Sequence, residues 1–121
     1  MEFNEFFFVF LRRDIDFQYS ADHDKQTLNA GHFQFQLEQK LANNLLVSGP
    51  LDGAGGIYLF KTEGFTKESL HSLLQKDPLI KIGMFIPEIH KWFVPHFMMT
   101  IKQPKPVEIN GFFKDLIKAP K

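Results

Sequence analysis

The chain has 121 residues, a length that suits one domain with a single core, so we do not expect a second domain. Basic and acidic residues number 14 each, so the net charge is zero and binding to nucleic acid or to an anionic membrane is not indicated. The chain contains no cysteine, which excludes disulfides, thiol nucleophiles and cysteine-ligated zinc, and favours a reducing, cytoplasmic compartment.

The first half of the chain predicts three strands and one helix. The predicted first strand, residues 5–11, contains the continuous apolar run 6–11, which is typical of a central strand buried on both faces and too short for a signal peptide or a membrane span. Residues 13–29 are acidic and without periodicity, which indicates a long loop with a potential function. Apolar residues at three- and four-residue spacing then predict an amphipathic helix that begins at about residue 25 or 30. Short strands are expected at 45–48 and 57–61, with a glycine-rich turn between them.

The second half predicts one more helix and one more strand. Thr66 can cap the free amides of a helix, while Phe65 packs on Leu70 as a hydrophobic staple. This helix should end near residue 76, because Pro78 disfavours helical geometry at the residue before it. Residues 84–97 are strand-like, but they contain Pro87, which cannot donate to a sheet ladder. We therefore expect that strand to lie at an edge of the sheet or to be bulged.

The order strand, helix, strand, strand, helix, strand predicts an α+β fold of the ferredoxin-like, split βαβ type. Such a fold has a four-stranded antiparallel sheet with two helices on one face. We assign the domain to residues 1–97 and treat 98–121 as a C-terminal extension. Four large apolar residues in the extension should pack on the domain or on a dimer partner: Phe112, Phe113, Leu116 and Ile117.

Phenylalanine is unusually common, with 15 residues against two tyrosines and one tryptophan. This apolar area exceeds what a small core needs, so it indicates either a core that continues into a homodimer interface or a pocket for an apolar or aromatic ligand. We favour the interface, because the sheet face without helices needs a cover, and the two interpretations are compatible. Two such sheets packed face to face form a dimeric α/β barrel.

Three landmarks occur in a fixed order. His32 opens the first predicted helix, Gly49 follows it by 17 positions within Val-Ser-Gly-Pro-Leu, and Asp77 lies in Lys-Asp-Pro-Leu. In these motifs the chain resembles the YCII-related (YciI-like) family over roughly residues 5–94. It departs from the family pattern in the acidic loop 14–29 and in the tail beyond residue 95.

The resemblance implies the dimeric α/β-barrel fold and a pair formed by His32 and Asp77 in a cleft by the sheet. It also implies chemistry, because the family members of known activity are cofactor-free enzymes that act on small, often aromatic molecules. In such a pair the imidazole carries a proton near neutral pH, and the carboxylate fixes its tautomer and stabilises the imidazolium. The alternative is structural: His32 helps to start a helix and Asp77 forms a turn with Pro78.

Four further residues are candidates for binding a substrate beside this pair. Arg12 and Arg13 end the first strand, and either could bind a carboxylate through two hydrogen bonds. Ser48 precedes Gly49, but no nucleophile-elbow motif surrounds it, so we expect it to bind and not to attack. Trp92 shares a strand face with His90 and could line the cleft, although ordinary packing explains it equally well.

No metal site and no cofactor are expected. The run Asp22-His23-Asp24 has ligand-type side chains, but three adjacent loop residues cannot enclose an ion and no partner motif exists, so a solvated loop is favoured. The glycines before the third strand do not precede a helix, as a phosphate-binding loop would.

Two functions remain open. The first is a cofactor-independent acid/base enzyme of lyase or isomerase type that acts on a small, aromatic or carboxylate-bearing molecule, with His32 as proton carrier and Asp77 orienting it. The second is a non-catalytic small-ligand-binding or scaffold dimer. A polar, concave pocket that bears both residues favours the first, and a cleft filled by phenylalanines or by the tail favours the second.

Overall fold

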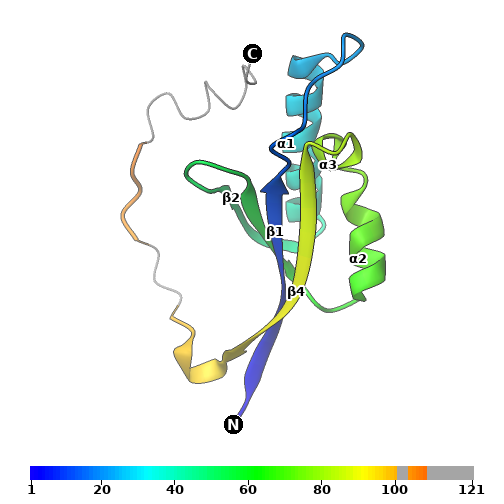
Figure 1. The fold of residues 1–121 in the computed structure, drawn as a ribbon. Helices are drawn as coiled ribbons and strands as arrows, with labels where there is room; N and C mark the ends of the chain where they lie inside the picture. Colours follow the sequence, from blue (N-terminus) through cyan, green and yellow to red (C-terminus); the bar gives the residue numbers. More distant parts are fainter. Residues whose placement is uncertain (101–103, 109–121) are drawn as a thin grey trace.

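The fold is known from a computed structural model, which describes residues 1–100 and 104–108. Along the chain (Figure 1) its elements are β1 (Phe3–Arg13), α1 (Lys25–Leu41), β2 (Leu45–Pro50), β3 (Gly56–Lys61), α2 (Lys67–Leu74), α3 (Pro78–Lys81), β4 (Phe85–Pro95) and the 3-10 helix η1 (His96–Met98). The apolar tail residues from Phe112 to Ile117 lie outside the described residues, so their docking stays a prediction.

The four strands form one antiparallel sheet in the order β2-β3-β1-β4. Figure 1 shows α1 and α2 on the same side of this sheet. Strand order and helix placement together define the ferredoxin-like α+β fold, so the predicted fold class is confirmed. The long strand β4 lies at one edge, where the missing amide of Pro87 is tolerated, and its register with β1 is continuous through Leu11 and Pro87.

The core lies between the sheet and the helices. From β1 it takes Phe7, Val9 and Leu11, which are at most 2% exposed, and from α2 it takes Leu70 and Leu74, which are fully buried. The alternate residues of β1 are only partly covered, so the prediction of a strand buried on both faces is wrong for the single chain. The reason is that both helices cover one face and none covers the other.

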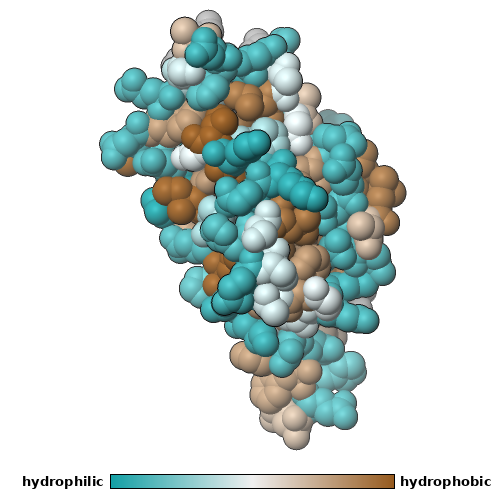
Figure 2. Space-filling model, turned by 90° about the vertical axis from the view of Figure 1, so that its right-hand side faces the viewer, coloured by the Kyte–Doolittle hydropathy of each residue, from teal (hydrophilic) through white to brown (hydrophobic). Residues whose placement is uncertain are grey.

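The uncovered face of the sheet is rich in apolar side chains. Residues paired directly across antiparallel strands share a face, and the pairs place Phe8 beside Leu59, and Leu59 beside Val47. We define the open face as its apolar residues Phe6, Phe8, Phe10, Val47, Ile57, Leu59, Ile86 and Trp92 together with the polar residues Arg12, Lys61, Glu88 and His90. Figure 2 views the molecule from the side of α2, where hydrophilic residues predominate and strongly apolar residues lie among them in patches; the lower end, where Figure 1 shows the N-terminus and η1, is weakly apolar.

Helix α1 begins earlier than the position of His32 indicated. Its N-cap is Asp24, whose side chain accepts hydrogen bonds from the amides of Gln26 and Thr27. His32 therefore lies two turns inside the helix, and the prediction that it opens the helix is wrong. Of the two predicted starts, residue 25 is correct, so the connecting loop is residues 14–24 and not 13–29. The signal was obscured because the first turn carries polar residues.

The second helical segment is divided in two. Thr66 caps α2 in a capping box with Ser69, as the staple motif indicated for its start. Helix α2 ends at Leu74, and Asp77 then caps the separate one-turn helix α3, whose first residue is Pro78. This short helix was not predicted. It turns the Asp77 side chain toward the core.

We expect Leu70→Ala to lower the free energy of unfolding by about 2–5 kcal/mol, because it leaves a cavity beneath α2. Leu41→Ala is the matched control, since the Leu41 side chain is 78% exposed, and it should change stability by less than about 0.5 kcal/mol. Urea unfolding of both variants measures the difference. Equal effects would contradict the assigned core.

Candidate active site

His32 of α1 and Asp77, the N-cap of α3, meet beneath the helices. The Nδ1 atom of His32 lies 2.8 Å from Oδ2 and 3.0 Å from Oδ1 of Asp77. Both residues are buried, at 6% and 0% exposure. The structure thus brings the two predicted residues into direct hydrogen-bonding contact, while their catalytic role stays a prediction.

A glycine allows the two helices to come this close. Gly31 precedes His32 in α1, and a Cβ atom at Gly31 would lie only 2.8 Å from the ring of Pro78. Because Gly31 has no side chain, the Pro78 ring can pack directly against α1. Asp77, the residue before Pro78, is held beside His32 as a consequence.

The Asp77 carboxylate is satisfied by donors from three elements. Oδ1 accepts the amide of Leu79 at 3.0 Å as the N-cap bond of α3, and Oδ2 accepts the hydroxyl of Tyr58 from β3 at 2.7 Å. His32 supplies the third donor from α1. A carboxylate without access to water needs such donors to stay ionised, and its negative charge in turn requires that the facing Nδ1 of His32 carries the proton.

Tyr58 is a neutral donor in this group. Burial first, and then the charge of Asp77 and the hydrogen bond to it, raise the pKa of the Tyr58 hydroxyl far above its ordinary value of about 10. The hydroxyl oxygen also lies 3.3 Å from Nδ1 of His32. Tyr58 therefore keeps its proton and fixes Asp77 from the side of the sheet.

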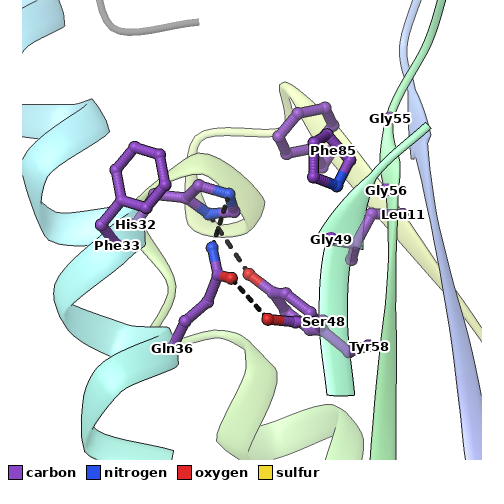
Figure 3. A pocket seen from close by; sticks show the side chains of 11 residues that line it. Leu11, His32, Phe33, Gln36, Ser48, Gly49, Gly55, Gly56, Tyr58 and Phe85 are labelled. Carbon is purple, nitrogen blue, oxygen red and sulfur yellow. Dashed lines mark hydrogen bonds between the residues drawn. The ribbon is translucent and has the colours of Figure 1, made fainter. Parts of the chain in front are cut away.

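The other ring nitrogen of His32, Nε2, contacts a second group of hydrogen-bonded side chains, which Figure 3 shows. With Nδ1 protonated, Nε2 has a free lone pair and accepts from the side-chain amide of Gln36, whose nitrogen lies 3.2 Å away. The hydroxyl of Ser48 donates to the carbonyl oxygen of Gln36 at 2.8 Å. Every hydrogen bond from Ser48 through Gln36 and His32 to Asp77 then has a consistent direction.

These groups border a cavity of about 160 Å³. Its polar side consists of His32, Gln36, Ser48 and Tyr58, and the rest of its wall is Leu11, Phe33, Gly49, Pro50, Gly55, Gly56 and Phe85 (Figure 3). Asp77 lies behind His32 and does not line it. Ser48 takes the place predicted for it, although it contacts Gln36 and not the imidazole.

Three predicted binding residues do not reach the cavity. Arg12 points to the other side of the sheet, where its Nε lies 3.1 Å from Glu88. Trp92 lies on the same open face and packs on the rings of Phe6 and Phe8. Arg13 is partly buried at the end of β1 but is not among the lining residues. Strand alternation explains Arg12 and Trp92, which lie on the face away from the helices, but not Arg13, which pairs with Phe85 and so shares the face of Leu11.

The sequence did not indicate that Gln36 and Tyr58 belong to the site. Gln36 follows His32 by four positions, which places both on one face of a helix, and this spacing was a usable signal. Tyr58 shares the buried face of β3 with Phe60, so it resembled an ordinary core residue. Its hydroxyl has a partner only because α3 brings a carboxylate above the sheet.

Within the described ranges, 1–100 and 104–108, no group of three or more His, Cys, Asp or Glu side chains is placed to hold a metal ion. In the acidic run, Asp24 caps α1 and His23 accepts the amide of Ser20, so both have local structural partners. No helix in the described ranges is long and apolar enough to cross a membrane.

No protein-family model matches the chain, and no curated protein matches it. Among solved structures it is similar to 5-chloro-2-hydroxyhydroquinone dehydrochlorinase from Burkholderia phenoliruptrix, in complex with 2,5-dihydroxybenzoquinone. The two share 17% sequence identity with a TM-score of 0.49, over 72% of this chain and 92% of that chain. The family indicated by the motifs therefore stays a prediction.

We predict that the hydroxyl of Tyr58 makes stability fall with pH in alkaline solution. The folded protein holds this proton where the unfolded chain releases it, so its contribution is present below about pH 10 and lost as the pH rises further. Above that pH, the unfolding free energy of the wild type should fall more steeply than that of Tyr58→Phe, by up to about 1.4 kcal/mol per pH unit.

Urea unfolding at a series of alkaline pH values measures the two slopes. Tyr19→Phe is the comparison variant: burial raises the pKa of Tyr19 too, but its hydroxyl donates to the sulfur of Met84 and not to a carboxylate, so this change should alter the slope less than Tyr58→Phe does. Parallel curves for the wild type and Tyr58→Phe would contradict the assignment.

Proposed function

We propose that the protein is a cofactor-independent acid/base enzyme of lyase or isomerase type that acts on a small molecule. His32 is the proton carrier and Asp77 orients it. The observation that carries this proposal is the hydrogen bond from Nδ1 of His32 to a fully buried carboxylate, with Nε2 on the side of a cavity. An imidazole held in this way is a base at one nitrogen only.

The geometry supports a simple reaction. A substrate in the cavity gives a proton to Nε2 of His32, and the electron pair of the broken bond becomes a new double bond in the substrate. Asp77 stabilises the imidazolium that forms, while Tyr58 and the amide of Leu79 keep the carboxylate in place. In an isomerase Nε2 returns the proton to a different substrate atom; in a lyase a leaving group departs with its bonding electrons.

A non-catalytic small-ligand-binding or scaffold dimer is the second candidate. Two observations favour it: Gln36 already occupies Nε2 of His32, and Phe33 and Phe85 take up part of the cavity wall. The enzyme is the better supported of the two, because a binding protein has no need of a buried carboxylate behind the imidazole. The resemblance in the His32, Gly49 and Asp77 motifs also favours the enzyme.

We further propose that two copies of the chain pack through the open face, as in a dimeric α/β barrel. The centre of this face is the aromatic and aliphatic surface around Phe8, and Val47 and Trp92 at the two edge strands are 62% and 47% exposed. Packing one copy on another removes this apolar area from water. We also propose that residues 98–121 pack on the domain or on the partner. We propose a cytoplasmic location as well.

Exchange of carbon-bound hydrogen for deuterium in a small ketone tests the proton-carrier role without knowledge of the natural substrate. In D₂O, the wild type should accelerate exchange at the acidic C–H positions of one-ring ketones, of which cyclohexanone is the first to use. His32→Ala should lower the accelerated rate by about a hundredfold or more, since general acid–base catalysis contributes about 10²–10⁴. Asp77→Asn should also lower it, because the wrong tautomer of His32 becomes accessible.

His71→Ala is the matched control, because His71 is exposed on α2 and away from the cavity, and it should leave the rate unchanged. Circular dichroism verifies that each variant is folded. A folded His32→Ala variant that keeps the full rate, or a wild type that accelerates no exchange, would rule out the proton-carrier role.

The dimer has its own test in sedimentation. We expect a dimer for the wild type at concentrations on the order of tens of micromolar. Phe8→Glu places a charge in the centre of the open face and should give a folded monomer. Leu41→Glu adds the same charge on an exposed part of α1 and should stay dimeric. A wild-type monomer at these concentrations would refute the dimer.

A further inference from the structure

The cavity beside His32 has a distinctive electrostatic character. None of the described residues that line it is a lysine or an arginine. Its polar side chains are the amide of Gln36, the hydroxyls of Ser48 and Tyr58, and the imidazole of His32. Two cations end β1 nearby: Arg12 is paired with Glu88 on the other face of the sheet, and Arg13 lies on the face of Leu11 but outside the cavity wall.

A negative charge lies directly behind this wall. The carboxylate of Asp77 is fully buried and lies 2.8 Å from the far nitrogen of His32, so little water screens it. An anionic ligand in the cavity would approach this charge with no cation among the described lining residues to offset it. An uncharged ligand meets no such cost.

The size of the cavity limits the ligand to about one ring. A volume of about 160 Å³ is close to that of an engineered cavity of about 150 Å³ that binds benzene. Phe33 and Phe85 give this space apolar sides, and Leu11 contributes to its floor near the sheet. A flat six-membered ring matches both the volume and these aromatic walls.

The side chain of Gln36 shows what polar group the site accepts. Its uncharged carboxamide donates to Nε2 of His32 and accepts from the hydroxyl of Ser48. A ligand that reaches Nε2 has to replace this carboxamide and satisfy the same partners. Gln36 is therefore an internal stand-in for the polar group of the ligand.

We propose that the cavity binds an uncharged molecule of one six-membered ring that carries a hydroxyl, carbonyl or amide group, and that this group replaces the Gln36 carboxamide between His32 and Ser48. The inference concerns the site of the proposed function and deepens that function by naming its ligand class. It selects against the carboxylate-bearing substrates that Arg12 and Arg13 suggested in the sequence.

Benzamide and benzoate provide the test, because they have nearly the same shape and differ in charge at neutral pH. Titration of the full-length protein by ligand-observed NMR should show benzamide binding and benzoate binding at least about tenfold more weakly. Ser48→Arg places a cation at the rim of the cavity and should reverse this preference, since arginine binds a carboxylate through two hydrogen bonds. Gln34→Arg adds the same charge on an exposed position of α1, away from the cavity, and should not.

Equal binding of the two probes by the wild type, a preference for benzoate, or binding of neither probe overturns the proposal. A preference that Gln34→Arg reverses as well as Ser48→Arg overturns it too, because the effect would then come from net charge and not from the cavity. Failure here is distinguishable from failure of the proposed chemistry, because the exchange experiment with His32→Ala measures proton transfer and is independent of the charge preference.

Discussion

The buried carboxylate of Asp77 imposes the tightest constraint on this structure. A carboxylate without contact to water is costly unless donors surround it, and here the donors come from α1, α3 and β3. The N-cap amide of α3 is local to Asp77, but His32 and Tyr58 arrive from distant parts of the sequence. The fold must therefore bring two helices and a central strand together at one point, and Gly31 makes the helix contact close enough for this.

This arrangement also determines the chemistry that is available. Because Asp77 takes the proton-bearing Nδ1 of His32, the basic lone pair of the imidazole faces Gln36 and the cavity. Tyr58 and His32 donate to the same oxygen of the carboxylate, Oδ2. Structural stability and the proposed catalytic orientation of His32 thus depend on the same hydrogen bonds, so proton exchange and stability require separate measurements.

The sequence contained the fold and the central pair, but not their surroundings. The order of strands and helices was readable from periodicity and caps, and the family resemblance in the His32, Gly49 and Asp77 motifs implied one site. The helix start was harder to place, because the first three residues after the Asp24 cap are polar. Tyr58 and Gln36 could not be assigned roles, since a tyrosine in a buried strand and a glutamine on a helix acquire them only from tertiary neighbours.

The pleat of β1 explains the largest error and links the two faces of the sheet. A strand that is apolar throughout gives no alternation, so the sequence did not show which residues face the helices. In the structure Phe7, Val9 and Leu11 lie in the core. The residues between and beside them lie on the open face: Phe6, Phe8, Phe10 and Arg12. A one-residue shift would exchange the two sets. The alternation keeps the proposed dimer surface and the cavity on opposite sides of one sheet, so a substitution such as Phe8→Glu alters association without touching the groups around His32.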